Sequence, residues 1–167
     1  MFIPFSIEQL VVSLFLALLS VAAIHDATTY RIPNRVSLAI AALYPVHVLA
    51  SGGDVAWMGA LLVAAAVFAA GTVLFAFGVV GGGDVKLLAA TALWAGPAGL
   101  ADLLAITAIG GGLMALFMTS SLRFGLALAL EAAGRPGGRE LVLGNTLPYG
   151  VAIAAGGWFT AAYLMVR

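Results

Sequence analysis

The feature that most constrains this chain is a long run, residues 55–80, that contains no charged side chain. A helix needs about 20 mostly apolar residues to cross a lipid bilayer, and this run is long enough. The whole sequence has the same character, since 63% of its 167 residues are apolar and only 8% are charged. A soluble domain carries roughly 25% charged residues, and one of about 150 residues leaves roughly 30% of its chain surface exposed. The sequence therefore predicts a protein embedded in lipid.

Charged residues, prolines and glycine clusters divide the sequence into six candidate spans. The fourth is the shortest, and it stops at Gly96-Pro97, a pair that ends helices. An alternative joins Val85–Met118 into one broken helix and leaves five spans. The six candidate spans are Ile7–His25, Arg35–Ala50, Val55–Val80, Val85–Ala95, Leu100–Met118 and Leu147–Val166.

The distribution of basic residues favours six spans, because cytoplasmic loops collect lysine and arginine. With six spans only Arg167 falls on the outer side, whereas five spans leave almost no bias. We therefore expect an all-α, polytopic membrane protein with six transmembrane helices, one domain over residues 1–167 and both termini on the non-cytoplasmic side. We do not expect the first span to be a cleaved signal peptide, because it opens with Glu8 rather than with basic residues. The residues that six spans place in the cytoplasm are Arg31, Arg35, Lys86, Arg123, Arg135 and Arg139.

The counts of charge and cysteine exclude several classes of function. Seven acidic and seven basic residues cancel, so no basic field points to a nucleic-acid partner. The chain has no cysteine, which excludes disulfides, thiolate metal sites and cysteine nucleophiles. We expect no metal and no cofactor.

Two aspartates stand out, because ionisable side chains are costly near lipid. Asp26 ends the first predicted span and Asp84 opens the fourth, so six spans bring both to the cytoplasmic membrane face. Taken alone, Asp26 reads as a solvated helix end and Asp84 as an N-cap. Together they predict more, since two carboxylates in a low dielectric repel and one must bind a proton. Aspartyl hydrolysis requires this arrangement: one carboxylate accepts a proton from water, and the other acid donates one to the substrate carbonyl.

Helix dipoles suggest which carboxyl holds the proton. Asp26 is at the C-terminal end of a predicted helix, where the dipole disfavours negative charge, and Asp84 is at an N-terminal end, where negative charge is stabilised. The hypothesis is therefore an ionised Asp84 and a protonated Asp26.

The glycines before Asp84 suggest a place where a substrate backbone approaches closely. Gly81–Gly83 carry no side chains and can adopt positive φ, and a protease binds its substrate as an extended peptide with backbone partners. The alternative is a flexible loop that closes a tight turn, and the two readings are compatible. Gly110–Gly112, inside the fifth predicted span, is better explained by close helix packing.

These runs resemble the type IV prepilin peptidases, the GxGD membrane aspartyl proteases of peptidase family A24. In that family the first catalytic aspartate precedes an Ile-Pro-Asn element, which matches Asp26 with Ile32-Pro33-Asn34. The second stands in Gly-x-Gly-Asp followed by x-Lys-Leu, which matches Gly81-Gly82-Gly83-Asp84-Val85-Lys86-Leu87. A third element, Pro148-Tyr149-Gly150, looks like the Pro-Tyr-Gly run of the family. The resemblance covers nearly the whole chain.

The resemblance implies removal of short, basic leader peptides from prepilins or pseudopilins at the cytoplasmic face of the bacterial inner membrane. The short chain looks like the minimal branch that serves tight-adherence (Flp) pili. Its implied partners are the prepilin substrates, the lipid bilayer and the pilus assembly machinery. Long members carry paired CxxC zinc motifs and N-methylate the new N-terminus. No cysteine is present here, so zinc is not expected and methylation is not assigned.

Several residues near these motifs are further candidates. Lys86 either steadies the carboxylate pair or extends to the membrane interface. Pro33 and Asn34 are expected to fix the start of the second span, and Tyr149 either anchors the sixth span at the interface or lines the site. The supporting and substrate-binding residues predicted are Gly81, Gly82, Gly83, Lys86, Pro33, Asn34, Pro148, Tyr149 and Gly150.

The remaining polar residues have simpler explanations. His25 points about 100° away from Asp26 around a helix, which argues against a general base, and His47 lacks the partners that a metal site needs. Asp54 and Asp102 are expected to be solvated at the outer face. The stretch 120–145 is long enough for a short amphipathic helix on the membrane surface or for a flap over the site.

Two other functions compete with the peptidase. The first is a small proton- or ion-coupled transporter or channel subunit that uses the same aspartates. Transport sites lie near the bilayer midplane between related halves, whereas both aspartates are predicted at one face. The second is a non-catalytic assembly subunit, which would not need paired carboxylates.

Overall fold

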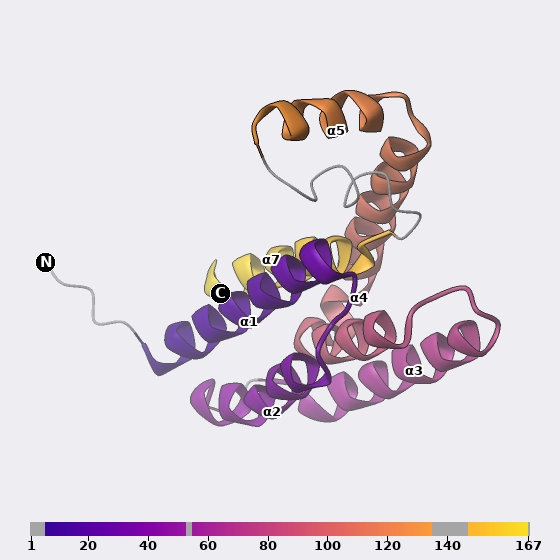
Figure 1. Cartoon of the computed structure of the whole chain (residues 1–167). Helices are drawn as coiled ribbons and strands as arrows, with labels where there is room; N and C mark the ends of the chain where they lie inside the picture. The colour runs from indigo at the N-terminus through magenta and orange to yellow at the C-terminus, as the bar shows by residue number, and fades with distance from the viewer. Residues whose placement is uncertain (1–5, 53–54, 135–146, 167) are drawn as a thin grey trace, which may run out of the picture.

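The computed structural model describes residues 6–52, 55–134 and 147–166, and these form helices without any strand. Asp54, Arg135, Arg139 and Arg167 lie outside the described residues, so the predictions that concern them stay predictions. Figure 1 shows a bundle in which α5 lies apart from the other helices. The helices are α1 (Ile7–Thr29), α2 (Asn34–Ala50), α3 (Trp57–Ala76), α4 (Gly82–Thr119), α5 (Leu122–Ala132) and α7 (Tyr149–Val166).

The predicted all-helical membrane architecture is confirmed at the level of its helices. Four of them, α1, α3, α4 and α7, are long and apolar enough to cross a membrane, and α2 is a shorter apolar helix. Helix α1 extends past His25 to Thr29, and it begins with a capping box in which Ser6 and Gln9 satisfy each other's backbone N–H groups. Reciprocal bonds of this kind stabilise a helix start.

The fourth and fifth predicted spans are one helix by hydrogen bonding, but the helix is broken at Gly96. This residue has φ 61° and ψ −171°, which lie outside the helical region, and Pro97 follows it. Only glycine adopts this backbone conformation readily. The break divides α4 into a first segment, residues 82–95, and a second segment, residues 97–119.

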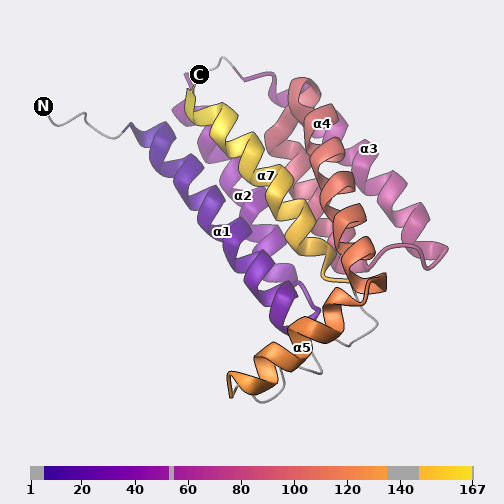
Figure 2. The ribbon, with the colours of Figure 1, turned by 90° about the horizontal axis from the view of Figure 1, so that it is seen from above.

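Contacts on either side of the break show that the two segments run in opposite directions, and Figure 2 shows the chain turning back there. The first segment is antiparallel to α3, and the second segment is antiparallel to α7. Helix α7 is itself antiparallel to α1, while the first segment also opposes α1. The pairs that fix these directions are Gly71 with Val85, Gly59 with Pro97, Gly156 with Leu103, Gly110 with Ala152, Gly157 with Leu19, and Phe15 with Trp94.

The core lies between α1, α2, the first segment of α4 and α7. Trp94 is at its centre: its ring stacks on Phe15 at 4.2 Å and on His47 at 5.1 Å, measured between ring centroids. The indole N–H of Trp94 donates to the carbonyl of Ile40 at 3.0 Å. This bond satisfies the one polar atom of the ring, and a buried indole needs such a partner.

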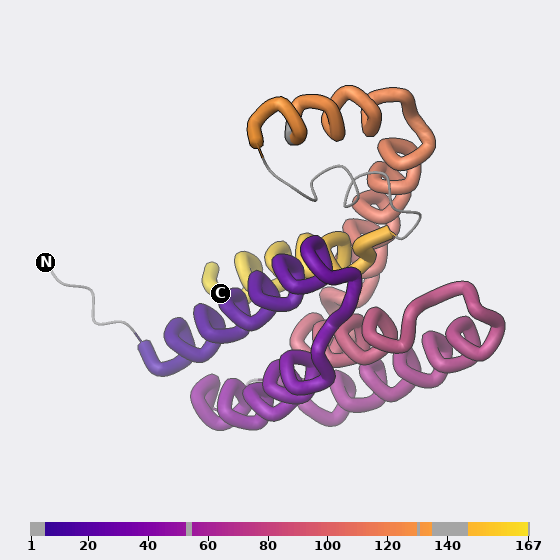
Figure 3. The backbone as a smooth tube through the Cα atoms, viewed as in Figure 1, coloured from indigo at the N-terminus to yellow at the C-terminus, as the bar shows by residue number. Residues whose placement is uncertain are grey.

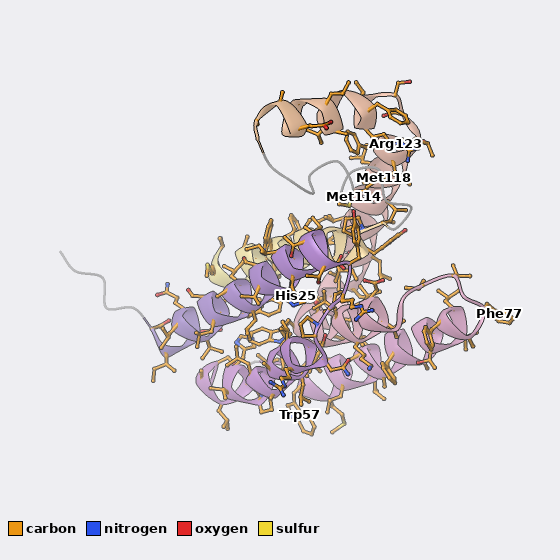
Figure 4. The ribbon with its side chains drawn as sticks, viewed as in Figure 1. His25, Trp57, Phe77, Met114, Met118 and Arg123 are labelled. Atoms are coloured by element: carbon orange, nitrogen blue, oxygen red, sulfur yellow. The ribbon has the colours of Figure 1, made fainter. Side chains whose placement is uncertain are left out.

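The outer surface of the bundle is apolar. Helix α3 has a single buried residue, Ala60, whereas Leu62 and Phe68 are exposed. Figure 4 shows Phe77, just after α3, pointing away from the bundle. Exposed apolar side chains on this scale mark a surface that something other than water covers, and for this chain that is lipid.

The break in α4 predicts that Gly96 tolerates no side chain. Gly96→Ala should lower the free energy of unfolding by about 1–3 kcal/mol, because alanine is strained at this φ and ψ. Gly112→Ala is the matched control: it lies in the helical second segment, and an added Cβ there has no atom within 4 Å. The control should be neutral or stabilising by up to about 1 kcal/mol. Thermal unfolding in detergent micelles measures the stability of both variants. Equal stability of the two would refute the reversal of the chain at Gly96.

Candidate functional site

Asp26 is held in the last turn of α1. Asp26 is only 4% exposed, although its side chain is ionisable. Tyr30 ends the helix in a left-handed conformation, φ 53° and ψ 31°, and its N–H donates to the carbonyl of Asp26 at 2.8 Å. The carboxylate is thereby fixed at a tightly terminated helix end.

The partner of the Asp26 side chain comes from the far end of the chain. The backbone N–H of Gly150, in the first turn of α7, donates to Oδ2 of Asp26 at 2.7 Å. A side chain at position 150 would interfere, because an added Cβ would lie 2.8 Å from that oxygen and 2.8 Å from Cδ1 of Ile32. Gly150 is therefore required for the close approach of α7 to the carboxylate.

This contact changes the hypothesis about the proton. That hypothesis considered only α1, whose C-terminal end disfavours a charge on Asp26. The structure adds the N-terminal end of α7 against the same carboxylate, and an N-terminal helix end favours negative charge. Asp84 is likewise in the first turn of its helix. The helix dipoles therefore do not distinguish the two carboxyls.

Asp84 is positioned by the glycines that precede it. Gly81 is the residue before α4, and a Cβ there would lie 2.7 Å from Oδ2 of Asp84. Gly83 faces Ile32, with 3.3 Å between its added Cβ and the Cβ of that residue. None of Gly81, Gly82 and Gly83 has a positive φ, and α4 already begins at Gly82. The three glycines therefore allow close packing around Asp84. The sequence had indicated that they could adopt a positive φ, and none of them does.

Asp26 and Asp84 line one cavity of about 570 Å³, and they are close enough to interact electrostatically. The cavity also receives Tyr30 and Arg31 from the connection between α1 and α2, which Figure 3 traces. Burial, together with the neighbouring Asp26, raises the pKa of the Tyr30 phenol, so this side chain remains an O–H donor at neutral pH. The full lining is Asp26, Tyr30, Arg31, Gly78, Val79, Val80, Gly81, Gly82, Gly83, Asp84, Leu147 and Tyr149.

Lys86 and Asn34 form a bond beside the cavity rather than in it. The ammonium of Lys86 donates to Oδ1 of Asn34 at 2.9 Å, which ties the start of α4 to the start of α2. Neither of these two side chains lines the cavity. Pro33 precedes α2 with φ −63° and ψ 130°, the extended conformation expected just before a helix.

The start of α7 contributes Pro148 and Tyr149. Pro148 is buried, and Tyr149 is 38% exposed while it lines the cavity. The ring of Tyr149 also packs against the second segment of α4, since a Cβ on Gly111 would lie 2.9 Å from it. Tyr149 therefore lies between the cavity and α4, and its role in binding stays a prediction.

The two histidines contact other parts of the bundle and do not line the cavity. Nδ1 of His25 contacts the carbonyl of Arg31 at 2.7 Å and Oγ1 of Thr29 at 2.8 Å, so this ring braces the turn after α1. His47 is buried, and its Nδ1 has no partner among the described residues. Among all the residues that the structure describes, no three His, Cys, Asp or Glu side chains come together as a metal site requires.

The stretch predicted to form a surface helix or a flap contains α5. Figure 2 shows α5 across the direction of the other helices, at the end of the bundle where α1 ends. Leu122 and Leu128 on it are exposed, Ala127 is buried, and the guanidinium of Arg123 lies 4.9 Å from the ring centre of Phe124. A short helix is thus present in this stretch, and its role remains a prediction.

Sequence reasoning did not select Tyr30, Arg31 or Leu147 as site residues. Tyr30 and Arg31 stand between Asp26 and the Ile32-Pro33-Asn34 element, so their place in that motif was an available signal. Leu147 directly precedes the Pro148-Tyr149-Gly150 element. Each therefore lies beside a motif that was already identified.

Comparison with known proteins supports one family. The model of the type IV leader peptidase family matches residues 13–130, a region that includes both aspartates. The third motif, at Pro148, lies beyond the matched residues. No curated protein matched the chain, and no solved structure matched it.

The bond between Asp26 and Gly150 predicts energetic coupling between residues that are far apart in sequence. Gly150→Ala should lower the free energy of unfolding by about 1–3 kcal/mol, because the added methyl group meets the carboxylate and Ile32. In the Asp26→Ala background the same change should cost about 1 kcal/mol less, since the carboxylate is gone. Thermal unfolding in micelles measures this double-mutant cycle, and strictly additive losses would contradict the contact.

Proposed function

The chain belongs to the type IV leader peptidase family, and from this premise we propose that it is a membrane aspartyl endopeptidase with Asp26 and Asp84 as its catalytic residues. The observation that carries the proposal is that both carboxyls line one cavity. They come from helices in different parts of the sequence, α1 and α4. Two interacting acids in a cavity are the arrangement that lets one titratable group act as a base and the other as an acid.

The proposed reaction needs one proton shared by the two carboxyls. The ionised carboxylate accepts a proton from water as the water oxygen bonds to the peptide carbonyl carbon, and the protonated acid donates its proton to the carbonyl oxygen. The tetrahedral intermediate then collapses and the C–N bond breaks. The leaving amine takes a proton from the acid that had accepted one, while a hydroxyl of the intermediate returns its proton to the other carboxylate as the product carbonyl forms. Tyr30, as an O–H donor in the same cavity, is proposed to help hold the substrate carbonyl.

We propose that the bundle crosses the membrane six times. The reversal at Gly96 supports this count, because it makes two antiparallel segments of α4 in addition to α1, α2, α3 and α7. Arg31 lines the cavity, and Lys86 lies just beside it. Basic residues gathered at one end favour the cytoplasmic side for that end, with both termini opposite. The active site would then lie at the cytoplasmic face of the bacterial inner membrane.

The proposed substrates are prepilins or pseudopilins with short leader peptides, and membership of the family supports them in general terms. The tight-adherence (Flp) type is our more specific proposal, supported by the absence of cysteine from this sequence. The pilus assembly machinery would be the partner that receives the processed protein. The family match does not favour the alternative of a proton- or ion-coupled transporter.

Replacing either aspartate tests the proposed chemistry. Asp26→Asn and Asp84→Asn should each lower leader removal by about 10³-fold or more, because each removes one partner in proton transfer. The measurement is the ratio of precursor to mature protein after coexpression with an Flp-type prepilin, with membrane content of each variant determined in parallel.

The matched control for these variants is Asp102→Asn. Asp102 is an exposed acid on the second segment of α4 and does not line the cavity, so this variant should process the prepilin at the wild-type rate. Near wild-type processing by Asp26→Asn or Asp84→Asn would contradict the catalytic assignment.

A further inference from the structure

One apolar residue of the connection between α1 and α2 contacts the neighbours of both aspartates. Ile32 is partly buried and packs against the core. Its Cδ1 atom lies 2.8 Å from a Cβ added to Gly150, and its own Cβ lies 3.3 Å from a Cβ added to Gly83. Gly150 binds Asp26, and Gly83 directly precedes Asp84. The side chain of Ile32 therefore lies between the start of α7 and the start of α4.

The spacing of the two aspartates is not set by direct packing of the helices that carry them. The backbones of α1 and α4, both of which the structure describes in full, hardly approach each other, whereas each packs closely on α2 and on α7. The stack of Phe15 on Trp94 does join α1 to α4, but it lies about three helical turns away from Asp26. Near the site, α1 and α4 are instead related through Ile32 and the start of α7.

The backbone just before Ile32 is held by a hydrogen bond. Nδ1 of His25 lies 2.7 Å from the carbonyl oxygen of Arg31, and because a carbonyl only accepts, this nitrogen carries the proton. His25, which is labelled in Figure 4, directly precedes Asp26 on α1. The position of Ile32 is therefore tied to the helix turn that carries the first aspartate.

The backbone just after Ile32 is held as well. Pro33 has φ −63°, and its ring allows little change of this angle. Asn34 then accepts a hydrogen bond at 2.9 Å from the ammonium of Lys86, two residues beyond Asp84. Ile32 is therefore also tied to the helix start that carries the second aspartate.

Ile32 can affect cleavage only through other residues. It does not line the cavity of Asp26 and Asp84, although Tyr30 and Arg31 do. Its side chain carries no hydrogen-bonding atom and cannot transfer a proton. An effect of Ile32 on the reaction would therefore come from the placement of the carboxyls, and not from contact with the substrate.

We propose that Ile32 is a positioning residue that sets the spacing of Asp26 and Asp84 by separating the start of α4 from the start of α7. This inference rests on the proposed function. Displacement of a reacting group by about 1 Å can lower a rate by about 100-fold. A shorter side chain at position 32 lets the two helix starts shift, and the carboxyls shift with them.

Shortening the side chain at position 32 tests the inference through its separate effects on kcat and KM. Ile32→Val removes only Cδ1, the atom that faces Gly150, whereas Ile32→Ala also removes both Cγ atoms. With an Flp-type prepilin in proteoliposomes, kcat should fall about tenfold in Ile32→Val and about 100-fold in Ile32→Ala. KM should stay within about twofold of wild type, because an interaction made only in the transition state affects kcat.

The matched control is Leu43→Ala. Leu43 is also a partly buried aliphatic residue that packs against the core, but it lies on α2, does not line the cavity and is not among the nearest neighbours of Gly83 or Gly150. This variant should lower Tm in micelles about as much as Ile32→Ala and keep the wild-type kcat. Equal losses of kcat in the two alanine variants, or a rise of KM with unchanged kcat in Ile32→Ala, would overturn the positioning role.

A measurement of the spacing itself does not depend on cleavage. The chain has no cysteine, so Asp26→Cys combined with Asp84→Cys provides one pair of thiols that bifunctional reagents of graded length can join. With Ile32 in place, one reagent length should give most of the crosslink, and Ile32→Ala should spread the crosslink over more lengths. The same distribution in both backgrounds would overturn the inference. Failure of the wild-type protein to cleave the precursor would instead refute the proposed function.

Discussion

The candidate site depends on the contact between the start of α7 and the side chain of Asp26. The Gly150 N–H and the Asp26 carboxylate meet at 2.7 Å across a separation of 124 residues, and the contact closes the bundle at that end. It joins the last helix to the first, and it places Tyr149 over the cavity that Asp84 enters from α4. A backbone donor from a helix N-terminus is a strong partner for an acid. This is how an almost apolar chain keeps a carboxyl buried.

Lipid explains why the polar groups gather at helix ends. Inside a bilayer every backbone N–H and C=O must be satisfied within its own helix, so donors become available only where helices begin. Asp26 uses the beginning of α7, and Asp84 stands in the first turn of α4. The two aspartates therefore lie where helix ends make backbone donors available. The apolar core around Trp94 and Phe15 holds those ends in register.

Much of the fold could be predicted from the sequence, because hydropathy and helix-ending residues are local signals. The apolar runs predicted α1, α3 and α7 to within a few residues, and Gly96-Pro97 predicted the break that divides α4. The contact of α7 with Asp26 could not be predicted, since it joins distant segments and no pattern of spacing encodes it. For the same reason the dipole argument missed one of the two helix ends that act on Asp26. Lys86 was expected near the carboxyls or at the interface; the structure shows its bond to Asn34, and its role at the site stays a prediction.

The central claim is that Asp26 and Asp84 share one cavity at the cytoplasmic face, and sided labelling of single cysteines tests it most directly. The chain has no cysteine of its own, so Asp26→Cys, Asp84→Cys and Asp102→Cys each carry one thiol. In inverted and right-side-out membrane vesicles, a small impermeant thiol reagent should label positions 26 and 84 from the cytoplasmic side only, and position 102 from the other side. Labelling of positions 26 and 84 from opposite sides would contradict the account.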